Sequence, residues 1–282
     1  MQDLSNSKII HIKKDGIEYI QFKKLLEYPE LKHAFTLRPL DFAGFNTYEE
    51  KREIVTENYK KICDSLEINY KNICRPQQTH TNRVEIVNEG DEGIYLEKYK
   101  NVDGLITNKK EKALVLAFAD CMPLLFYDPV KKVIANIHSG WRGTVQTISR
   151  NAVNEMISYY KCKPSDIIWC IGPTIRQCHF EVDTDVKDIF YNKLKDEIEI
   201  ERYIIKKNNV GVAHLGDPEE GNKYYIDTVE INKQILLNIG LKKENIIDSG
   251  ICTVCNQEKI HSYRAHKEKS GRNITIIQKW RV

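Results

Sequence analysis

The sequence has no long apolar run and almost no net charge. No uninterrupted apolar stretch approaches the roughly 18 residues that cross a bilayer, and residues 1–7 are polar rather than signal-like. Lys and Arg number 43 against 40 for Asp and Glu, which leaves a net charge of +3 and no electrostatic footprint for nucleic acid. We therefore expect a cytoplasmic protein whose partners include neither a membrane nor nucleic acid.

Paired histidines and paired cysteines are also scarce. The eight histidines include no His-x-His pair, the arrangement used by clustered copper sites, which disfavours a true multicopper oxidase. The eight cysteines are scattered, and without a secretory signal we expect reduced thiols instead of disulfides. Only Cys252 and Cys255 form a Cys-x-x-Cys pair. Without a second such pair it is a weak zinc-ribbon signal, and no helix-opening context supports a thioredoxin-like motif.

The remaining pattern predicts an α/β (α+β) fold of mixed sheets flanked by helices. No repeat or linker divides the 282 residues, so we expect a single domain over 1–282 that includes an N-terminal hairpin over 8–22. A helix is predicted over 49–66 with Ile54, Tyr59, Ile62 and Leu66 on its buried face. The other predicted elements are strands over 32–37, 84–87, 167–171, 203–205, 210–212, 246–247 and 274–278, and helices over 185–194 and 228–239.

The most informative stretch runs from residue 114 to residue 143. Two apolar runs, 113–119 and 132–137, predict buried strands, and they lead into Cys121 and His138. A thiol and an imidazole together suit zinc. A glycine-bracketed turn after His138 precedes a predicted helix over 144–160, where free backbone N–H groups favour an anion. The best candidate for a third ligand is His80.

Several short motifs occur in the order found in one protein family. They are residues 78–80 (Gln-Thr-His), 103–107 (Asp-Gly-Leu-Ile-Thr), 119–124 (Ala-Asp-Cys-Met-Pro-Leu), 138–143 (His-Ser-Gly-Trp-Arg-Gly), 171–173 with 180–182, and 252–253 with 262–264 and 271–272. By these motifs the chain resembles the YfiH-type family, long labelled polyphenol oxidase or laccase domain and now associated with purine nucleoside phosphorylase activity. The resemblance covers about residues 31–280.

This resemblance implies an αββα sandwich with one zinc ion held by His80, Cys121 and His138. It also implies phosphorolysis of adenosine and inosine, with methylthioadenosine as a further candidate and adenosine deamination as a side activity. The partners would then be purine nucleosides and phosphate, in a monomer or small homo-oligomer, and Cu²⁺ could substitute for Zn²⁺. Two departures from the family pattern, at residues 36–41 and 260–261, leave the preferred nucleoside open.

Three protein ligands and an open position are typical of catalytic zinc. The expected catalytic residues are therefore the three ligands and Asp120, which acts as an acid/base group or as an orienter of its neighbour. The expected substrate-binding residues are Arg38, Gln78, Arg142 and Arg264. Trp141 is interpreted as packing, and Asp103 and Glu181 as turn and sheet-edge residues; the histidines 179, 214, 261 and 266 show no metal spacing.

The residues alone leave other functions open. His80, Cys121 and His138 lie 41 and 17 residues apart, which matches no ligand spacing, and each would by default be an inert core residue. Cys121 and His138 could instead form a nucleophile pair. A zinc- or Cys-His-dependent hydrolase acting on a cell-wall or peptide-like precursor is therefore one alternative. A non-catalytic protein that binds zinc and a nucleotide is another.

Overall fold

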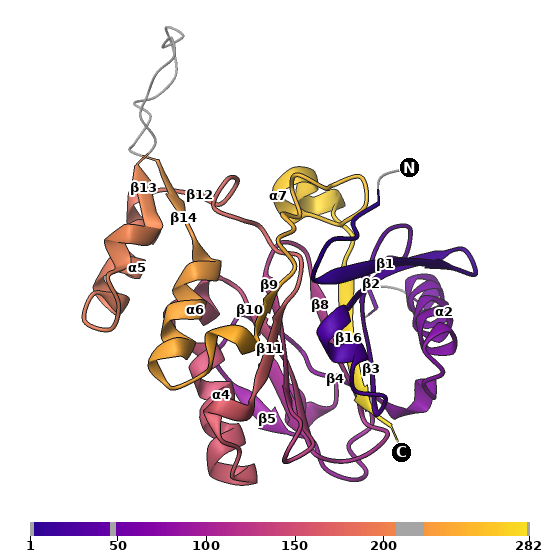
Figure 1. The fold of residues 1–282 in the computed structure, drawn as a ribbon. Coiled ribbons are helices and arrows are strands. Elements are labelled where there is room, and N and C mark those ends of the chain that lie inside the picture. Colours follow the sequence, from indigo (N-terminus) through magenta and orange to yellow (C-terminus); the bar gives the residue numbers. More distant parts are fainter. Residues whose placement is uncertain (1–2, 46–48, 207–222, 281–282) are drawn as a thin grey trace, which may run out of the picture.

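The computed structural model describes residues 3–45, 49–206 and 223–280 (Figure 1). The helices are α1 (Lys23–Leu26), α2 (Glu49–Ser65), α3 (Trp141–Val145), α4 (Ile148–Tyr160), α5 (Thr184–Leu194), α6 (Thr228–Asn238) and α7 (Tyr263–His266). The strands are β1 (Ile9–Lys14), β2 (Ile17–Phe22), β3 (Leu31–Thr36), β4 (Ile73–Arg75), β5 (Val84–Ile86), β6 (Gly93–Ile94), β7 (Gly104–Thr107), β8 (Ala113–Phe118), β9 (Met122–Asp128), β10 (Val133–Ser139), β11 (Ile168–Ile171), β12 (Glu181–Val182), β13 (Ile204–Lys206), β14 (Tyr224–Ile226), β15 (Ile246–Asp248) and β16 (Asn273–Lys279).

Two mixed sheets form the centre of the molecule. The seven-stranded sheet has the order β1-β2-β3-β16-β8-β4-β6 and is antiparallel as far as β8, after which β4 runs parallel to both of its neighbours. The six-stranded sheet has the order β15-β11-β9-β10-β7-β5, with antiparallel pairs at its centre and a parallel pair at each edge. A small third sheet has the order β12-β14-β13.

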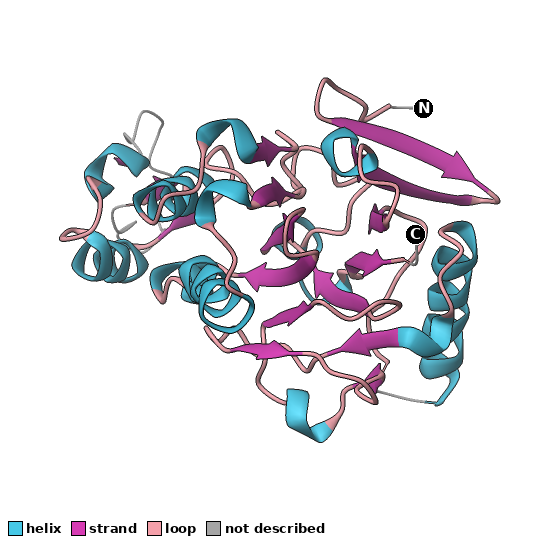
Figure 2. Ribbon diagram, turned by 60° about the horizontal axis from the view of Figure 1, so that its bottom comes forward, coloured by secondary structure: helices cyan, strands magenta, loops and turns pink. Residues whose placement is uncertain are grey.

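The two large sheets pack face to face, and helices cover their outer faces (Figures 1 and 2). Apolar side chains of β8, such as Leu114 and Leu116, pack with Leu125 and Tyr127 of β9 in a core between the sheets. On the outer face of the seven-stranded sheet lies α2, and α4 and α6 lie on that of the six-stranded sheet. This arrangement confirms the predicted class of mixed sheets layered between helices.

Several elements differ from the prediction in their bounds or in their buried residues. In α2, Val55 takes the buried position predicted for Ile54, whose side chain is 59% exposed, because residues 55, 59 and 62 share one helical face. The helix predicted over 144–160 begins earlier, at Trp141, and is broken into α3 and α4 where Thr147 adopts a left-handed φ of 55°. The predicted N-terminal hairpin is confirmed by the antiparallel pairing of β1 with β2.

Strand β9 is absent from the prediction, although it lies near the centre of the six-stranded sheet. Its second residue is Pro123, which has no N–H to give to a ladder and so argues against a central strand. Pro123 lies near the start of β9, and its carbonyl still accepts the N–H of Gly172 at 2.9 Å.

None of the helices in the described ranges combines the length and apolar character that a bilayer crossing requires. The strand predicted over 210–212 and His214 lie outside the described residues.

Candidate metal centre and cleft

The structure brings the three predicted metal ligands together. His138 is the penultimate residue of β10, Cys121 lies in the turn between β8 and β9, and His80 lies in the loop between β4 and β5. Their ligand atoms are all within 4.8 Å of one another, and the two imidazole rings meet edge to face with centroids 5.0 Å apart. Residues separated by up to 58 positions therefore share one point at the ends of strands from both sheets.

Asp103, predicted as a turn and sheet-edge residue, instead orients two of these ligands. It is fully buried, and its Oδ1 atom lies 2.8 Å from Nδ1 of His138 and accepts the backbone N–H of His80 at 3.0 Å. Its Oδ2 atom accepts the N–H of Thr81 at 2.8 Å. A carboxylate on Nδ1 leaves Nε2 of His138 to face the metal, as in carboxylate–histidine–zinc arrangements.

The electrostatics of the centre favour a thiolate. Burial alone would raise the pKa of Cys121, but the His138 imidazole and its neighbour His80 outweigh it and lower that pKa to about 6. Burial likewise opposes the charged form of His138, yet the Cys121 thiolate and the Asp103 carboxylate raise its pKa. These shifts favour the ionised sulfur of Cys121, which is the form that binds a metal ion.

Gly140 leaves room for this cluster. A Cβ atom at position 140 would lie 2.9 Å from Cδ2 of His80 and 3.2 Å from Sγ of Cys121. His80 itself adopts a left-handed φ of 63° and Asp120, beside Cys121, one of 81°. Non-glycine residues in that region cost free energy and are concentrated at functional sites. Gly140 and the two left-handed residues therefore allow the three ligand side chains to approach one another closely.

The donor set fits a metal ion with an open coordination position. One thiolate and two imidazoles suit zinc, and among the described residues no fourth His, Cys, Asp or Glu atom joins the group. All three ligands line a cleft of about 710 Å³, a volume typical of small-molecule sites. A bound ion would therefore face a cavity that can admit a substrate.

Aromatic and cationic side chains that were not predicted as substrate-binding residues also line the cleft. The aromatic residues are Phe42, Tyr95, Trp141, Phe180 and Tyr263, and the additional arginines are Arg75 and Arg272. Arg75 is buried, its Nη1 contacts the Tyr59 hydroxyl, and its Nε has no hydrogen-bond partner. Four of these residues (141, 180, 263 and 272) lie within the family motifs. Phe42, Tyr95 and Arg75 carry no signal beyond their residue types, because they come from segments far apart along the chain.

The predicted substrate-binding residues divide into two pairs. Gln78 and Arg264 line the cleft, although the Gln78 amide also pairs with the backbone of Ala117 at 2.8 and 2.9 Å. Arg38 lies in the wall of a different cavity and donates to the Gln257 carbonyl at 3.2 Å. Arg142 is exposed and stacks on the Trp141 ring at 4.3 Å without lining the cleft.

Asp120 joins the centre to two neighbouring segments. Its Oδ1 accepts the Thr253 hydroxyl at 2.5 Å, and its Oδ2 accepts the backbone N–H of Arg264 at 2.6 Å. Its carbonyl accepts the Thr174 hydroxyl at 2.8 Å. Because both carboxylate oxygens are engaged, this geometry supports the orienting role that was one of the two roles predicted for Asp120.

Residues 39–279 match the family described as multi-copper polyphenol oxidoreductase laccase. The chain belongs to this family. A Bacillus subtilis member named purine nucleoside phosphorylase YlmD is 32% identical over 238 residues, which cover 83% of this chain and 80% of the relative. A Bacteroides thetaiotaomicron protein named purine nucleoside phosphorylase is 29% identical over 285 residues, covering 95% of this chain and 98% of the relative.

Two solved structures share the fold. The structure of the Bacillus licheniformis hypothetical protein YfiH superposes with a TM-score of 0.79 at 28% identity, covering 92% of this chain and 96% of that one. The structure of YlmD from Geobacillus stearothermophilus gives a TM-score of 0.81 at 24% identity, covering 97% and 100%. The YfiH-type resemblance deduced from the motifs is confirmed.

Proposed function

We propose that this chain is a zinc-dependent purine nucleoside phosphorylase whose reaction takes place in the cleft at His80, Cys121 and His138. The observation that carries the proposal is the three-ligand centre opening into a cleft that also holds aromatic rings and arginines. Relatives named purine nucleoside phosphorylase support it. The proposed substrates are adenosine and inosine, with methylthioadenosine as a further one and adenosine deamination as a side activity.

Different side chains of the cleft suit the purine and the phosphate. Phosphorolysis forms a bond between a phosphate oxygen and the ribose C1′ atom while the bond from C1′ to the purine nitrogen breaks. Aromatic side chains such as Phe180 and Tyr95 provide apolar surface for a purine ring. Arg75 and Arg272 provide the permanent positive charge that matches phosphate.

A zinc ion bound by the three ligands would supply Lewis acidity at the cleft wall. The chain's part is to hold the ligands in place: Asp103 fixes the His138 ring, and Asp120 fixes the turn that carries Cys121. Copper could occupy the same ligands as a substitute. The description of the family names multi-copper chemistry, but the sequence has no His-x-His pair from which a copper cluster could be built.

The test is to incubate the purified, metal-analysed protein with inosine and with adenosine, in the presence and absence of phosphate, and to identify every product. We expect phosphate-dependent release of hypoxanthine and adenine together with ribose 1-phosphate. Cys121→Ser and His80→Ala should abolish the activity in folded protein, whereas His11→Gln on the N-terminal hairpin should retain it. Turnover that persists in the two ligand variants would contradict the site.

The same assay separates the alternatives. Nucleoside cleavage that does not need phosphate would indicate a hydrolase. Tight metal binding without turnover of any nucleoside would indicate a non-catalytic zinc protein. Conversion of adenosine to inosine without phosphate would establish the deaminase side activity, and activity restricted to copper-loaded protein would overturn the zinc assignment.

A further inference from the structure

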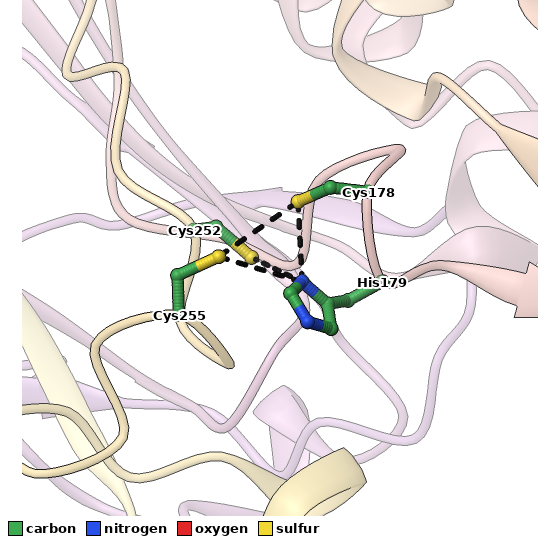
Figure 3. A group of neighbouring side chains, drawn as sticks. All are labelled: Cys178, His179, Cys252 and Cys255. Carbon is green, nitrogen blue, oxygen red and sulfur yellow. Dashed lines mark hydrogen bonds between the residues drawn. The ribbon is translucent and has the colours of Figure 1, made fainter.

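A second group of metal-ligand side chains lies outside the centre described above. Cys178, His179, Cys252 and Cys255 place one ligand atom each within 4.8 Å of all the others (Figure 3). Figure 3 shows the three thiols and Nδ1 of the imidazole pointing toward one another from two loops. We propose that these four residues hold a structural zinc ion.

The spacing of the atoms matches a tetrahedron around zinc. With Zn–S of about 2.3 Å and Zn–N of about 2.0–2.1 Å, tetrahedral geometry puts sulfurs about 3.8 Å apart and sulfur about 3.6 Å from nitrogen. The Sγ atoms of Cys178 and Cys255 are 4.0 Å apart. The distances from Nδ1 of His179 to Sγ of Cys178, Cys252 and Cys255 are 3.2, 3.6 and 3.5 Å.

Backbone hydrogen bonds and a β-bridge hold the two pairs of ligand residues beside each other. Cys178 and His179 sit in a tight turn in which the N–H groups of His179 and Phe180 both donate to the Arg176 carbonyl at 2.8 Å. Cys252 is joined to Thr174, at the start of the same segment, by a parallel β-bridge. The two loops are therefore fixed beside each other before any ligand side chain is considered.

Four ligands close the coordination sphere, and this distinguishes the site from the one in the cleft. Three Cys and one His is a ligand set of structural zinc, which leaves no position for substrate. A disulfide is the competing use of these thiols, but it would join only two sulfurs, at about 2.05 Å, and leave the third cysteine and the imidazole without a purpose. The convergence of all four atoms favours the ion.

Cys252 and Cys255 are only a weak signal when they are considered without their partners. The other half is the adjacent pair Cys178-His179, and His179 lies 73 residues before Cys252. His179 was interpreted as showing no metal spacing, which the structure corrects. The signal that could have revealed the site is the combination of one adjacent Cys-His pair with one Cys-x-x-Cys pair.

The proposed ion would hold the wall of the cleft. Thr174 and Phe180, on either side of the Cys178-His179 turn, line the cleft. The Arg264 guanidinium donates to the His179 carbonyl at 2.8 Å, and Thr253, next to Cys252, donates to Asp120. The ion would thereby connect the loop that carries Phe180 to the turn that carries the Cys121 ligand.

The first experiment counts zinc in the full-length protein purified under reducing conditions. We expect two zinc ions per chain, falling to one in Cys255→Ser and in Cys178→Ser, which are exposed positions, and to one in Cys121→Ser. Cys162→Ser, a buried cysteine outside both groups, is the matched control and should keep two. One ion per chain in the wild type, lost with Cys121→Ser, would overturn the proposal.

A second measurement identifies the ligands without relying on activity. Loading with Co²⁺ should produce sulfur-to-cobalt charge-transfer absorption, part of which disappears in Cys178→Ser and in Cys255→Ser while the Cys121 contribution stays. If those variants do not fold, thiol labelling of the wild type decides instead: Cys178 and Cys255 should be protected in the zinc form and become reactive on chelation. A Cys178–Cys255 disulfide in protein kept reduced, or thiols equally reactive before and after chelation, would contradict the site.

Discussion

At the scale of single residues, the centre depends on a side chain that is not a ligand. Asp103 contacts both histidine segments through one carboxylate, and burial raises its pKa less than the hydrogen bonds from His138 and Thr81 lower it. A buried carboxylate held ionised in this way fixes the tautomer of His138 and raises its basicity as a ligand. Asp103, which contacts the ligand residues without being a ligand itself, therefore fixes their arrangement.

We expect Asp103→Asn to weaken metal binding by about 10- to 100-fold while the protein stays folded. The amide has no charge, and it cannot accept at both ends the N–H groups that the carboxylate accepts. The measurement is zinc affinity by chelator competition near pH 7. Asp91→Asn is the matched control, because Asp91 is also a buried carboxylate with backbone and hydroxyl partners but does not line the cleft. Equal affinities in the two variants would refute the role of Asp103.

The sequence could predict the ligands of this centre but not their supports. Cys121 and His138 follow two apolar runs that predict buried strands, with His80 as the candidate third ligand. The family motifs then support all three residues, whose spacing alone carries no ligand pattern. Asp103 and Arg75 were not recognised, because a carboxylate before a glycine and an arginine before a proline look like ordinary turn residues. Asp103 comes beside the ligands and Arg75 into the cleft wall only when the sheets bring distant segments together.

At the scale of elements, the loop after β11 is anchored to β15 by an ion-pair cluster. Arg176 contacts both oxygens of Asp248, and Lys233 of α6 donates to the same carboxylate at 3.0 Å. Burial alone would raise the pKa of Asp248, but the Arg176 and Lys233 charges lower it to about 2. The turn with Cys178 and His179 begins at Arg176, so this cluster fixes the segment that approaches the second metal site.

This cluster predicts an acid-dependent loss of stability. A carboxyl group that titrates near 3.8 when unfolded and near 2 when folded stabilises the protein fully above about pH 4 and loses its contribution as the pH falls to about 2. We expect Asp248→Asn to lower the free energy of unfolding by about 2 kcal/mol at pH 7, a difference that shrinks below pH 4.

Urea unfolding between pH 2 and pH 7 measures the effect of Asp248→Asn. Asp64→Asn, on the exposed side of α2, is the control for an acid-to-amide change. A destabilisation by Asp248→Asn that stays constant down to pH 2 would show that packing, and not the charge, supplies the stability.

Element existence was largely predictable, whereas element pairing was not. The Asp15-Gly16 turn specified the β1–β2 hairpin, and apolar runs located β8, β10 and β11. Nothing local places β16 between β3 and β8, because that position depends on pairing a strand near residue 276 with strands near residues 34 and 115. Such non-local register is fixed by tertiary packing, which single-segment patterns do not record.

At the scale of the whole molecule, the two large sheets are joined by a buried polar link as well as by apolar packing. Asn136 of β10 donates to the carbonyls of Leu114 and Thr275 at 3.0 and 3.3 Å. In return its Oδ1 accepts the Thr275 hydroxyl at 2.7 Å. Since β10 belongs to one sheet and β8 and β16 to the other, this link fixes how the sheets lie on each other.

We expect Asn136→Ala to lower the free energy of unfolding by about 2–4 kcal/mol, because it leaves the buried Thr275 hydroxyl without an acceptor and opens a cavity. Thr275→Val alone should also destabilise, but the double variant should cost about 1 kcal/mol less than the sum, since the second change removes the orphaned partner. Thr275→Ser keeps the hydroxyl and should show the smaller loss of one methyl group. Urea unfolding of the wild type and the four variants measures the coupling. Additive losses would show that the two side chains contribute independently and that apolar packing alone sets the alignment of the sheets.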